Sequence, residues 1–263
     1  MAEHQFRETA AAGYDRAVGH MTRQLLPPLL HTARLAPGQR VLDIATGTGI
    51  AAEAAAKMVG PNGHVTAADI SPAMVERARE RLGGVPNISF AVEDGQRLTF
   101  DDQSFDAVLC NMGLMYFPDP ARGLSEFHRV LRPGGRVAVS NNTTPGRSLI
   151  SRVLVIIGRH VPSKAQEAAR LFALGDEVHV RTLFGAAGFC DVETATETLR
   201  IEFPSFDAYF GGVEAGAGNV GQEYMALPED TRRVVREEAR RDVSDAGGPI
   251  EVEVEARIAS GRR

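Results

Sequence analysis

Three aspartates, each placed where a strand is predicted to end, are the residues best suited to chemistry in this 263-residue chain. Asp43 lies in the run VLDIATGTG (residues 41–49), and Asp69 and Asp94 follow the next two apolar runs. A carboxylate can hold an ammonium group or accept hydrogen bonds from hydroxyl and amino groups. Because ligands of doubly wound sheets bind beyond the carboxyl ends of the strands, we expect these side chains to converge on one crevice.

A glycine-rich turn separates the first of these strands from the helix that follows it. Gly47 and Gly49 carry no side chain, so a ligand can approach the backbone of the turn closely. The turn has no Walker lysine, which argues against a nucleoside triphosphate. The same residues fit the GxGxxA pattern of NAD-linked oxidoreductases, with Asp69 about twenty residues further on, so that class stays open at this point.

The elements that must position these residues alternate as strand and helix from about residue 40 onward. The pattern predicts parallel strands at 40–45, 64–70, 88–92, 105–111 and 136–141. It predicts helices at 50–59, 73–82, 121–131 and 177–187. Residues 192–203 and 250–258 alternate apolar and charged side chains, which is typical of antiparallel strands covered on one face. We therefore predict an α/β fold with a doubly wound seven-stranded sheet, in which an antiparallel terminal pair follows five parallel strands.

Three segments fall outside this alternation, and we expect all three to be helical. Residues 1–35 are predicted to pack across the carboxyl edge of the sheet, where they can help to cover a ligand. Residues 145–175 and 203–247 are predicted to be lid insertions on a core formed by residues 36–145. The whole chain, 1–263, is thus predicted to be a single domain.

Composition excludes several classes of function. The formal net charge of −5 disfavours a nucleic-acid partner. Cys110 and Cys190 lie in apolar contexts without a CxxC or Cys/His cluster, so we predict two buried small hydrophobes and no metal site. The sequence shows neither a signal peptide nor an apolar run long enough for a membrane span, which predicts a cytoplasmic protein. It leaves the oligomeric state open.

Four stretches resemble class I S-adenosylmethionine (SAM)-dependent methyltransferases, namely VLDIATGTG, AADISPAMVERAR, VEDGQRLTFDDQSFDAVLC and EFHRVLRPGGRV. The resemblance is strongest to the branch that contains the ubiquinone and menaquinone biosynthesis enzymes and many small-molecule methyltransferases. It is specific over about residues 36–145. It implies a Rossmann-like fold, SAM as the cofactor and S-adenosylhomocysteine as the product.

The resemblance also implies a set of cofactor contacts. The methionine end of SAM is expected beside Asp43, Gly47 and Gly49, the ribose at Asp69, and the adenine at Asp94 with the Gly95 backbone. The other residues expected beside the cofactor are Tyr14, Ala45, Ile70, Asn111 and Met112. Of these, Ala45 replaces the first glycine of the usual family motif, as it also does in the quinone branch.

The acceptor is predicted to be a small, apolar or aromatic metabolite, methylated at oxygen, nitrogen or carbon. Tyr116, Phe117 and Asn142 are candidates for its pocket, although packing in the core explains the two aromatic residues equally well. We name no catalytic residue, because in-line transfer from a sulfonium needs alignment in a dry site more than it needs a base. His128 lies on a helix expected to pack on the sheet, which favours a structural role.

Two other functions are compatible with the same residues. A SAM-binding module without catalytic activity could act through a protein partner. An NAD-linked oxidoreductase is the less favoured alternative, because the chain lacks a Tyr-x-x-x-Lys motif and its last two strands are predicted to be antiparallel.

Overall fold

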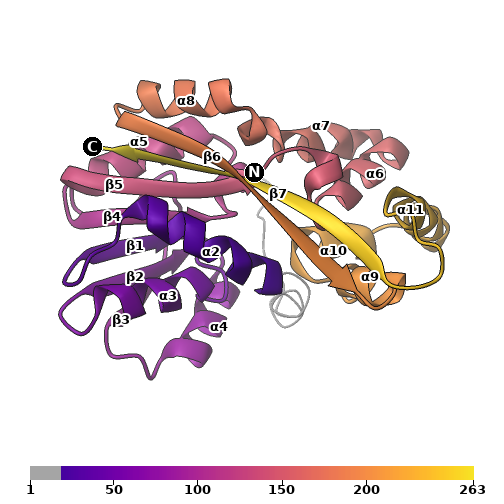
Figure 1. Ribbon diagram of the computed structural model, residues 1–263, viewed down its shortest axis with the longest axis horizontal. Helices are drawn as coiled ribbons and strands as arrows, with labels where there is room; N and C mark the ends of the chain where they lie inside the picture. Colours follow the sequence, from indigo (N-terminus) through magenta and orange to yellow (C-terminus); the bar gives the residue numbers. More distant parts are fainter. Residues whose placement is uncertain (1–18) are drawn as a thin grey trace.

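The alternating strands and helices assemble into one seven-stranded sheet with the order β3-β2-β1-β4-β5-β7-β6 (Figure 1). The computed structural model describes residues 19–263. The strands are β1 (Arg40–Ile44), β2 (His64–Asp69), β3 (Ile88–Val92), β4 (Phe105–Asn111), β5 (Leu131–Asn142), β6 (Cys190–Phe203) and β7 (Ile250–Arg262). Strands β1 to β5 pair in parallel, and β7 pairs antiparallel with both β5 and β6. The predicted fold class is confirmed. The antiparallel strand β7 lies inside the sheet, and β6 lies at its edge.

Alternation along the strands separates two apolar layers. Val41, Leu109 and Ala138 contribute to the layer covered by α2 (Gly19–Ala33), α3 (Ile50–Val59) and the end of α4 (Pro72–Leu82). The neighbouring residues Leu42 and Val139 face the opposite layer, which is covered by α5 (Pro120–Val130) and α8 (Glu177–Ala186). Both faces are therefore buried, as parallel strands require.

The helices begin where local chemistry allows it. Ser71 caps α4 by accepting a hydrogen bond from the Met74 N–H at 3.4 Å, and Pro72 occupies the first helical position. Asp119 caps α5 in the same way, through the Arg122 N–H at 3.0 Å. These caps keep the turns that precede them short, and those turns lie at the carboxyl edge of the sheet.

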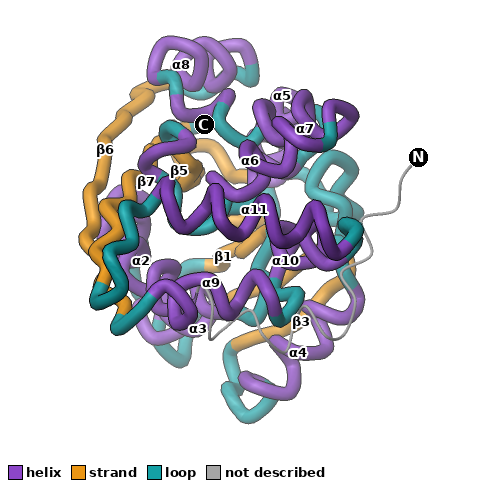
Figure 2. Tube along the Cα trace, turned by 90° about the vertical axis from the view of Figure 1, so that its right-hand side faces the viewer, coloured by secondary structure: helices purple, strands orange, loops and turns teal. Residues whose placement is uncertain are grey.

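Two insertions form a helical layer at the end of the sheet to which β1 to β5 point (Figure 1). The first holds α6 (Arg152–His160) and α7 (Pro162–Arg170), and the second holds α9 (Phe206–Glu214), α10 (Gly218–Met225) and α11 (Glu229–Asp242). Helix α6 contacts both α10 and α11. Figure 2 looks onto this layer, with the end of β1 visible behind its helices.

Helix α2 corrects the prediction for the N-terminal segment. Its side chains Leu26, Leu29 and Ala33 are buried in the layer shared with α3, so α2 packs on a face of the sheet and not across its carboxyl edge. The physical reason is that β5 and β7 extend the apolar face beyond the reach of α3, and α2 covers that area. Residues 1–18 lie outside the described part of the chain.

Smaller differences concern strand ends and one cysteine. Strand β5 begins at Leu131, which pairs with Phe105 ahead of a bulge at residues 132–135. Cys110 is buried as predicted, but Cys190 is exposed, because it begins the edge strand β6, where its Sγ lies 3.2 Å from the Arg262 carbonyl oxygen. Within residues 19–263 no group of three or more His, Cys, Asp or Glu side chains could hold a metal ion. Over the same residues, no helix combines the length and apolar character needed to cross a bilayer.

Candidate functional site

The sheet order places the predicted acidic residues in one row along the carboxyl edge. Asp94 follows β3, Asp69 ends β2, and Asp43 lies near the end of β1, and these three strands are neighbours in that order. Because adjacent strands lie ~4.8 Å apart, the row spans ~10 Å. Asn111 continues it at the end of β4. An elongated ligand can therefore meet all four side chains at once.

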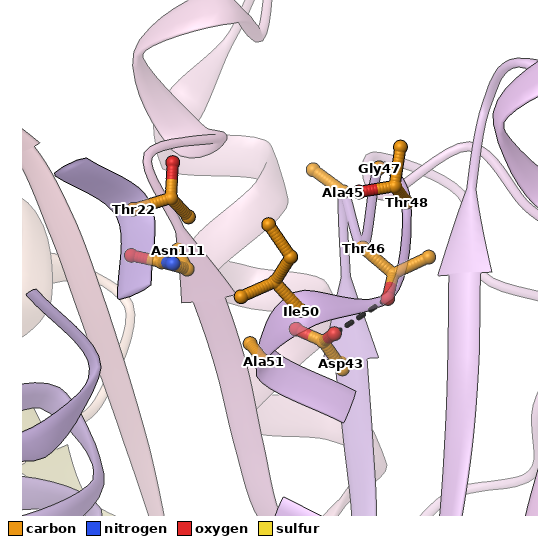
Figure 3. A pocket seen from close by; sticks show the side chains of 9 residues that line it. All are labelled: Thr22, Asp43, Ala45, Thr46, Gly47, Thr48, Ile50, Ala51 and Asn111. Atoms are coloured by element: carbon orange, nitrogen blue, oxygen red, sulfur yellow. Dashed lines mark hydrogen bonds between the residues drawn. The ribbon is translucent and has the colours of Figure 1, made fainter. Parts of the chain in front are cut away.

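A pocket lies at the β1 end of this row (Figure 3). Four of the predicted residues line it, namely Asp43, Ala45, Gly47 and Asn111. The sequence analysis missed the others, which are Thr22, Thr46, Thr48, Ile50 and Ala51. Thr46 and Thr48, which alternate with Ala45, Gly47 and Gly49 in the motif, were a usable signal for the turn. Thr22 had none, because only the packing of α2 brings it to the pocket.

Asp43 is fully buried and only half satisfied. Its Oδ2 accepts a hydrogen bond from the Thr46 hydroxyl at 2.6 Å, whereas Oδ1 has no hydrogen-bond partner within residues 19–263. Burial raises the pKa of Asp43 to about 7, and the nearby Asp69 carboxylate adds to the rise. A buried carboxylate oxygen without a donor is energetically costly, so this position favours a ligand that brings a cation or an N–H group.

Asn111 presents the complementary group on the same pocket. Its Oδ1 accepts from the Ser140 hydroxyl at 2.7 Å, which orients the amide. Its Nδ2 is a buried donor that finds no acceptor among the described residues. The pocket thus offers one unused acceptor, on Asp43, and one unused donor, on Asn111. This combination fits the ammonium and carboxylate groups of an amino acid.

Asp69 holds the glycine turn in shape. Its Oδ2 accepts from the Gly47 N–H and its Oδ1 from the Ser71 N–H, both at 2.9 Å. Burial raises its pKa. Gly47 has φ 55° with open space where a side chain would be. Gly49 is the N-cap residue of α3 with φ 82°, and a Cβ atom added there would lie 2.7 Å from the Leu82 Cδ1. Each carboxylate oxygen of Asp69 retains a second lone pair that can accept a ligand hydroxyl.

The outer end of the row is apolar. Ile70, which directly follows β2, is 59% exposed, and Val92, which ends β3, is 54% exposed. Asp94 comes two residues after Val92, and its Oδ1 accepts from the Gln96 N–H at 2.9 Å. Exposed aliphatic side chains beside a carboxylate suit a flat ring that carries an amino group. The sequence analysis named Ile70, Asp94 and Gly95 but missed Val92.

The residues predicted for the acceptor separate into two groups. Asn142 is buried and donates from Nδ2 to the Ser151 hydroxyl at 3.1 Å, whereas Tyr116 is 38% exposed. Phe117 instead is half-buried and packs against the core, with its ring centroid 6.1 Å from that of Phe127. Ser151 was missed, because nothing in the sequence distinguishes it from an ordinary helix cap.

Three further residues complete the comparison with the sequence analysis. Met112 is half-buried and packs against the core, with φ 54°. His128 packs on Phe189, with ring centroids 5.1 Å apart, and burial lowers its pKa. This contact agrees with the structural role favoured for His128. Tyr14, expected beside the cofactor, lies outside the described residues.

Comparison with known proteins places this geometry in a family. Residues 41–135 match the methyltransferase domain family. The chain is 43% identical over 184 residues to a demethylmenaquinone methyltransferase from Clavibacter sepedonicus, which covers 65% of this chain and 74% of that protein. It is 41% identical over 120 residues to a ubiquinone/menaquinone biosynthesis C-methyltransferase from Ectopseudomonas mendocina, which covers 44% and 47%.

The fold has a solved counterpart in phosphoethanolamine N-methyltransferase 2 from Haemonchus contortus, determined with phosphomonomethylethanolamine and S-adenosylhomocysteine. The TM-score is 0.62 at 18% identity, over 99% of this chain and 58% of that one. Fold, site and sequence together define a class I SAM-dependent methyltransferase with SAM as its cofactor. The chain belongs to the branch of this family that contains the ubiquinone and menaquinone biosynthesis enzymes. The comparisons support neither the NAD-linked oxidoreductase nor the binding module.

Proposed function

We propose that SAM lies along the carboxyl edge of the sheet and methylates a quinone-type aromatic acceptor held beside β4 and β5. The observation that carries the cofactor placement is the pair of unused buried atoms, Asp43 Oδ1 and Asn111 Nδ2, on one pocket. The acceptor class is supported by the relatives, which are named for demethylmenaquinone and for ubiquinone and menaquinone biosynthesis.

Each part of SAM then has partners in the row. Asp43 and Asn111 hold the amino and carboxyl groups of the methionine end, with Ala45 and Gly47 allowing close approach and Gly49 shaping the turn as the N-cap of α3. Asp69 accepts from the ribose hydroxyls. Asp94 and the backbone of Gly95 bind the adenine edge, and Ile70 and Met112 flank the cofactor. Tyr14 is assigned to the same site from the family resemblance alone.

The residues of this chain act by binding and orienting SAM and the acceptor and by excluding water from the site. When bound, SAM supplies a methyl group on a sulfonium. A site that these residues keep dry would favour the transfer, because the positive charge of the sulfonium would be dispersed in the transition state. Holding donor and acceptor in line supplies a large part of the acceleration. We assign no general base.

The two insertions, at 145–175 and 203–247, are proposed as the lid that excludes water, on a single domain that spans the chain. Buried apolar side chains of α6, including Val153 and Ile157, face the same core as the sheet. A small-molecule acceptor in place of nucleic acid, and a cytoplasmic location, remain predictions from the sequence.

A calorimetric titration tests the cofactor placement. We expect Asp43→Asn to weaken SAM binding by about tenfold or more, because a charge-assisted hydrogen bond contributes ~1.5–3 kcal/mol. Asp101→Asn, an exposed aspartate before β4 at the opposite edge of the sheet, is the matched control and should bind SAM normally. Wild-type affinity in a folded Asp43→Asn protein would remove the assignment of the methionine end.

The acceptor class is tested separately, with methyl-labelled SAM and reduced demethylmenaquinone. Label in the quinone, at a rate that depends on enzyme concentration, is the expected result. Normal SAM binding without transfer to this acceptor would exclude it and leave the cofactor site intact.

A further inference from the structure

The glycine turn beside the cofactor pocket is easy to deform. Gly47 and Thr48 line the pocket, and Gly49 follows them as the N-cap of α3 (Figure 3). The two glycines have φ 55° and φ 82°. Because glycine adopts positive and negative φ about equally readily, neither residue fixes the direction of the adjoining peptide groups by itself. The shape that a ligand meets must therefore be imposed by contacts from outside the turn.

Two side chains from other elements supply these contacts. Asp69, at the end of β2, accepts a hydrogen bond from the Gly47 N–H at 2.9 Å. Arg81, in the last turn of α4, donates from its Nε to the Thr48 carbonyl oxygen at 2.8 Å. The peptide group between Gly47 and Thr48 is thus held on both sides, by an acid from one element and a base from another.

The guanidinium of Arg81 is itself held in place by Glu53 of α3. Its Nη1 donates to the Glu53 Oε2 at 2.6 Å, and the Arg81 side chain is 25% exposed. The Lys57 ammonium donates to the other oxygen of the same carboxylate at 2.7 Å. Hydrogen bonds from Lys57 and Arg81 lower the pKa of Glu53, so the carboxylate stays ionised at neutral pH. Because a guanidinium presents its N–H groups in a rigid planar fork, the contact with Glu53 orients the contact with the turn.

The end of α4 also packs directly against the turn. A Cβ atom added to Gly49 would lie 2.7 Å from the Leu82 Cδ1 and 3.6 Å from the Arg81 Nη2. Leu82 is buried in the apolar layer that covers this face of the sheet. Because α4 cannot move away from the turn without exposing Leu82, the Arg81 side chain stays within reach of the Thr48 carbonyl.

The shape of the turn bears on the carboxylate that faces the ligand. Thr46, Gly47 and Thr48 line the same pocket as Asp43. The Thr46 hydroxyl donates to the Asp43 Oδ2 at 2.6 Å, and the Thr46 carbonyl oxygen accepts from the Gly49 N–H at 2.9 Å. A change in the direction of the Thr48 carbonyl therefore alters the backbone that positions the partner of Asp43.

We propose that Arg81 is a positioning residue for the methionine end of SAM. By holding the Thr48 carbonyl oxygen, it keeps the turn in the shape that the amino-acid part of the cofactor meets. This inference rests on the proposed function, which places that part of SAM in the pocket. The sequence analysis did not name Arg81, because its partner Thr48 lies 33 residues earlier in the chain.

A binding experiment tests the proposal without requiring turnover. The probes are S-adenosylhomocysteine and 5′-methylthioadenosine, which share the adenosine and the sulfur atom and differ in the amino-acid end. The quantity measured by calorimetry is the preference, defined as the affinity for S-adenosylhomocysteine divided by the affinity for 5′-methylthioadenosine. A general loss of structure lowers both affinities alike, whereas a deformed turn lowers the preference.

We expect the preference to fall about three- to tenfold in Arg81→Met, because the ligand must then order the turn that one hydrogen bond held before. Methionine keeps an unbranched apolar stem and a high helix propensity, so α4 should remain intact. Arg81→Lys keeps the charge without the fork and should show a similar loss. Arg77→Met is the matched control on the same helix. Since Arg77 pairs with Glu80 at 2.8 Å and both are exposed, this variant should keep the wild-type preference.

The possible failures are distinguishable. If the wild-type protein does not bind S-adenosylhomocysteine, or binds it no better than 5′-methylthioadenosine, the proposed placement of the cofactor fails first. If the wild-type protein shows the preference and Arg81→Met keeps it, or Arg81→Lys restores it fully, the positioning role is overturned while the cofactor site stands. If Arg81→Met does not fold, Glu53→Gln replaces it, since this variant loosens the guanidinium and should lower the preference by a smaller factor. An unchanged preference in Glu53→Gln then overturns the proposal.

Discussion

At the scale of single residues, the site is defined by polar atoms whose partners are missing. Asp43 is 0% exposed and keeps one carboxylate oxygen unpaired within residues 19–263. Asp69, by contrast, already uses both of its oxygens to hold Gly47 and Ser71. The two aspartates of one row therefore have different tasks. Asp43 is arranged for a ligand, whereas Asp69 also shapes the turn that the ligand must approach.

The raised pKa of Asp43 makes cofactor binding dependent on pH. With a pKa of about 7, the carboxyl group of the free enzyme is largely protonated at lower pH. An ammonium group requires the ionised form, so we expect SAM affinity to fall towards tenfold per pH unit below about pH 7. The α-amino group of SAM stays protonated in that range. Calorimetry between about pH 5.5 and pH 7 measures the slope.

The effect of Asp43 on the free energy of unfolding has the opposite pH dependence. The pKa of Asp43 is higher in the folded protein than its ordinary value of 3.8. The contribution of Asp43 to the free energy of unfolding is therefore most favourable at low pH and is lost as the pH rises from about 4 through about 7. Asp43→Asn should remove both dependences. An unchanged SAM slope in that variant would show that another group titrates.

At the scale of elements, the first strand-to-helix turn and the loop after β4 depend on each other. Ala45 has φ 56°, a conformation that favours glycine, and glycine is the residue the family motif usually has there. A Cβ atom added to Gly113 would lie 2.5 Å from the Ala45 Cβ and 2.9 Å from the Cys110 Sγ. The side chain of Ala45 thus requires a glycine in the loop across from it.

This contact predicts coupling between two substitutions. Gly113→Ala should destabilise the fold by ~1–3 kcal/mol through overpacking. Ala45→Gly should be neutral or stabilise by up to ~1 kcal/mol, because it relieves the left-handed conformation. In the double variant the loss should be ~1 kcal/mol smaller than the sum of the single effects. Urea unfolding of the four proteins measures the coupling, and strict additivity would contradict it.

At the scale of the whole molecule, the two insertions are separated in the sequence by strand β6. They nevertheless pack against each other and form one body. Arg152 of α6 is buried and lies 3.1 Å from Asp242 of α11. Lys164 of α7 lies 2.9 Å from Glu223 of α10. A lid made of two segments that share such contacts should open and close as a unit.

Hydrogen exchange tests whether the two insertions open together. Arg152→Ala should destabilise the protein by ~2 kcal/mol, less than for a fully buried pair because Asp242 is partly exposed. The amides of α11 should then exchange faster, although the substitution lies in α6. Lys164→Gln is the control, since a pair this exposed contributes less than ~1 kcal/mol. Faster exchange confined to α6 would show that the insertions move separately.

The sequence by itself determined the elements and the chemistry of the row. Period-two and helical patterns, glycines and caps are local signals, so the strands, most helices and the acids Asp43, Asp69 and Asp94 could be placed from them. The same locality explains the errors. Whether Cys190 is exposed depends on β6 being the edge strand, which its own residues do not encode.

Only the tertiary structure determined which strands, helices and side chains are neighbours. The position of β7 between β5 and β6 and the packing of α2 on a face of the sheet both join residues that are distant in sequence. The physical reason is that each strand pairing and each apolar contact forms only when the partner surface is already in place. A residue such as Thr22 reaches the pocket only through neighbours that the local sequence does not contain.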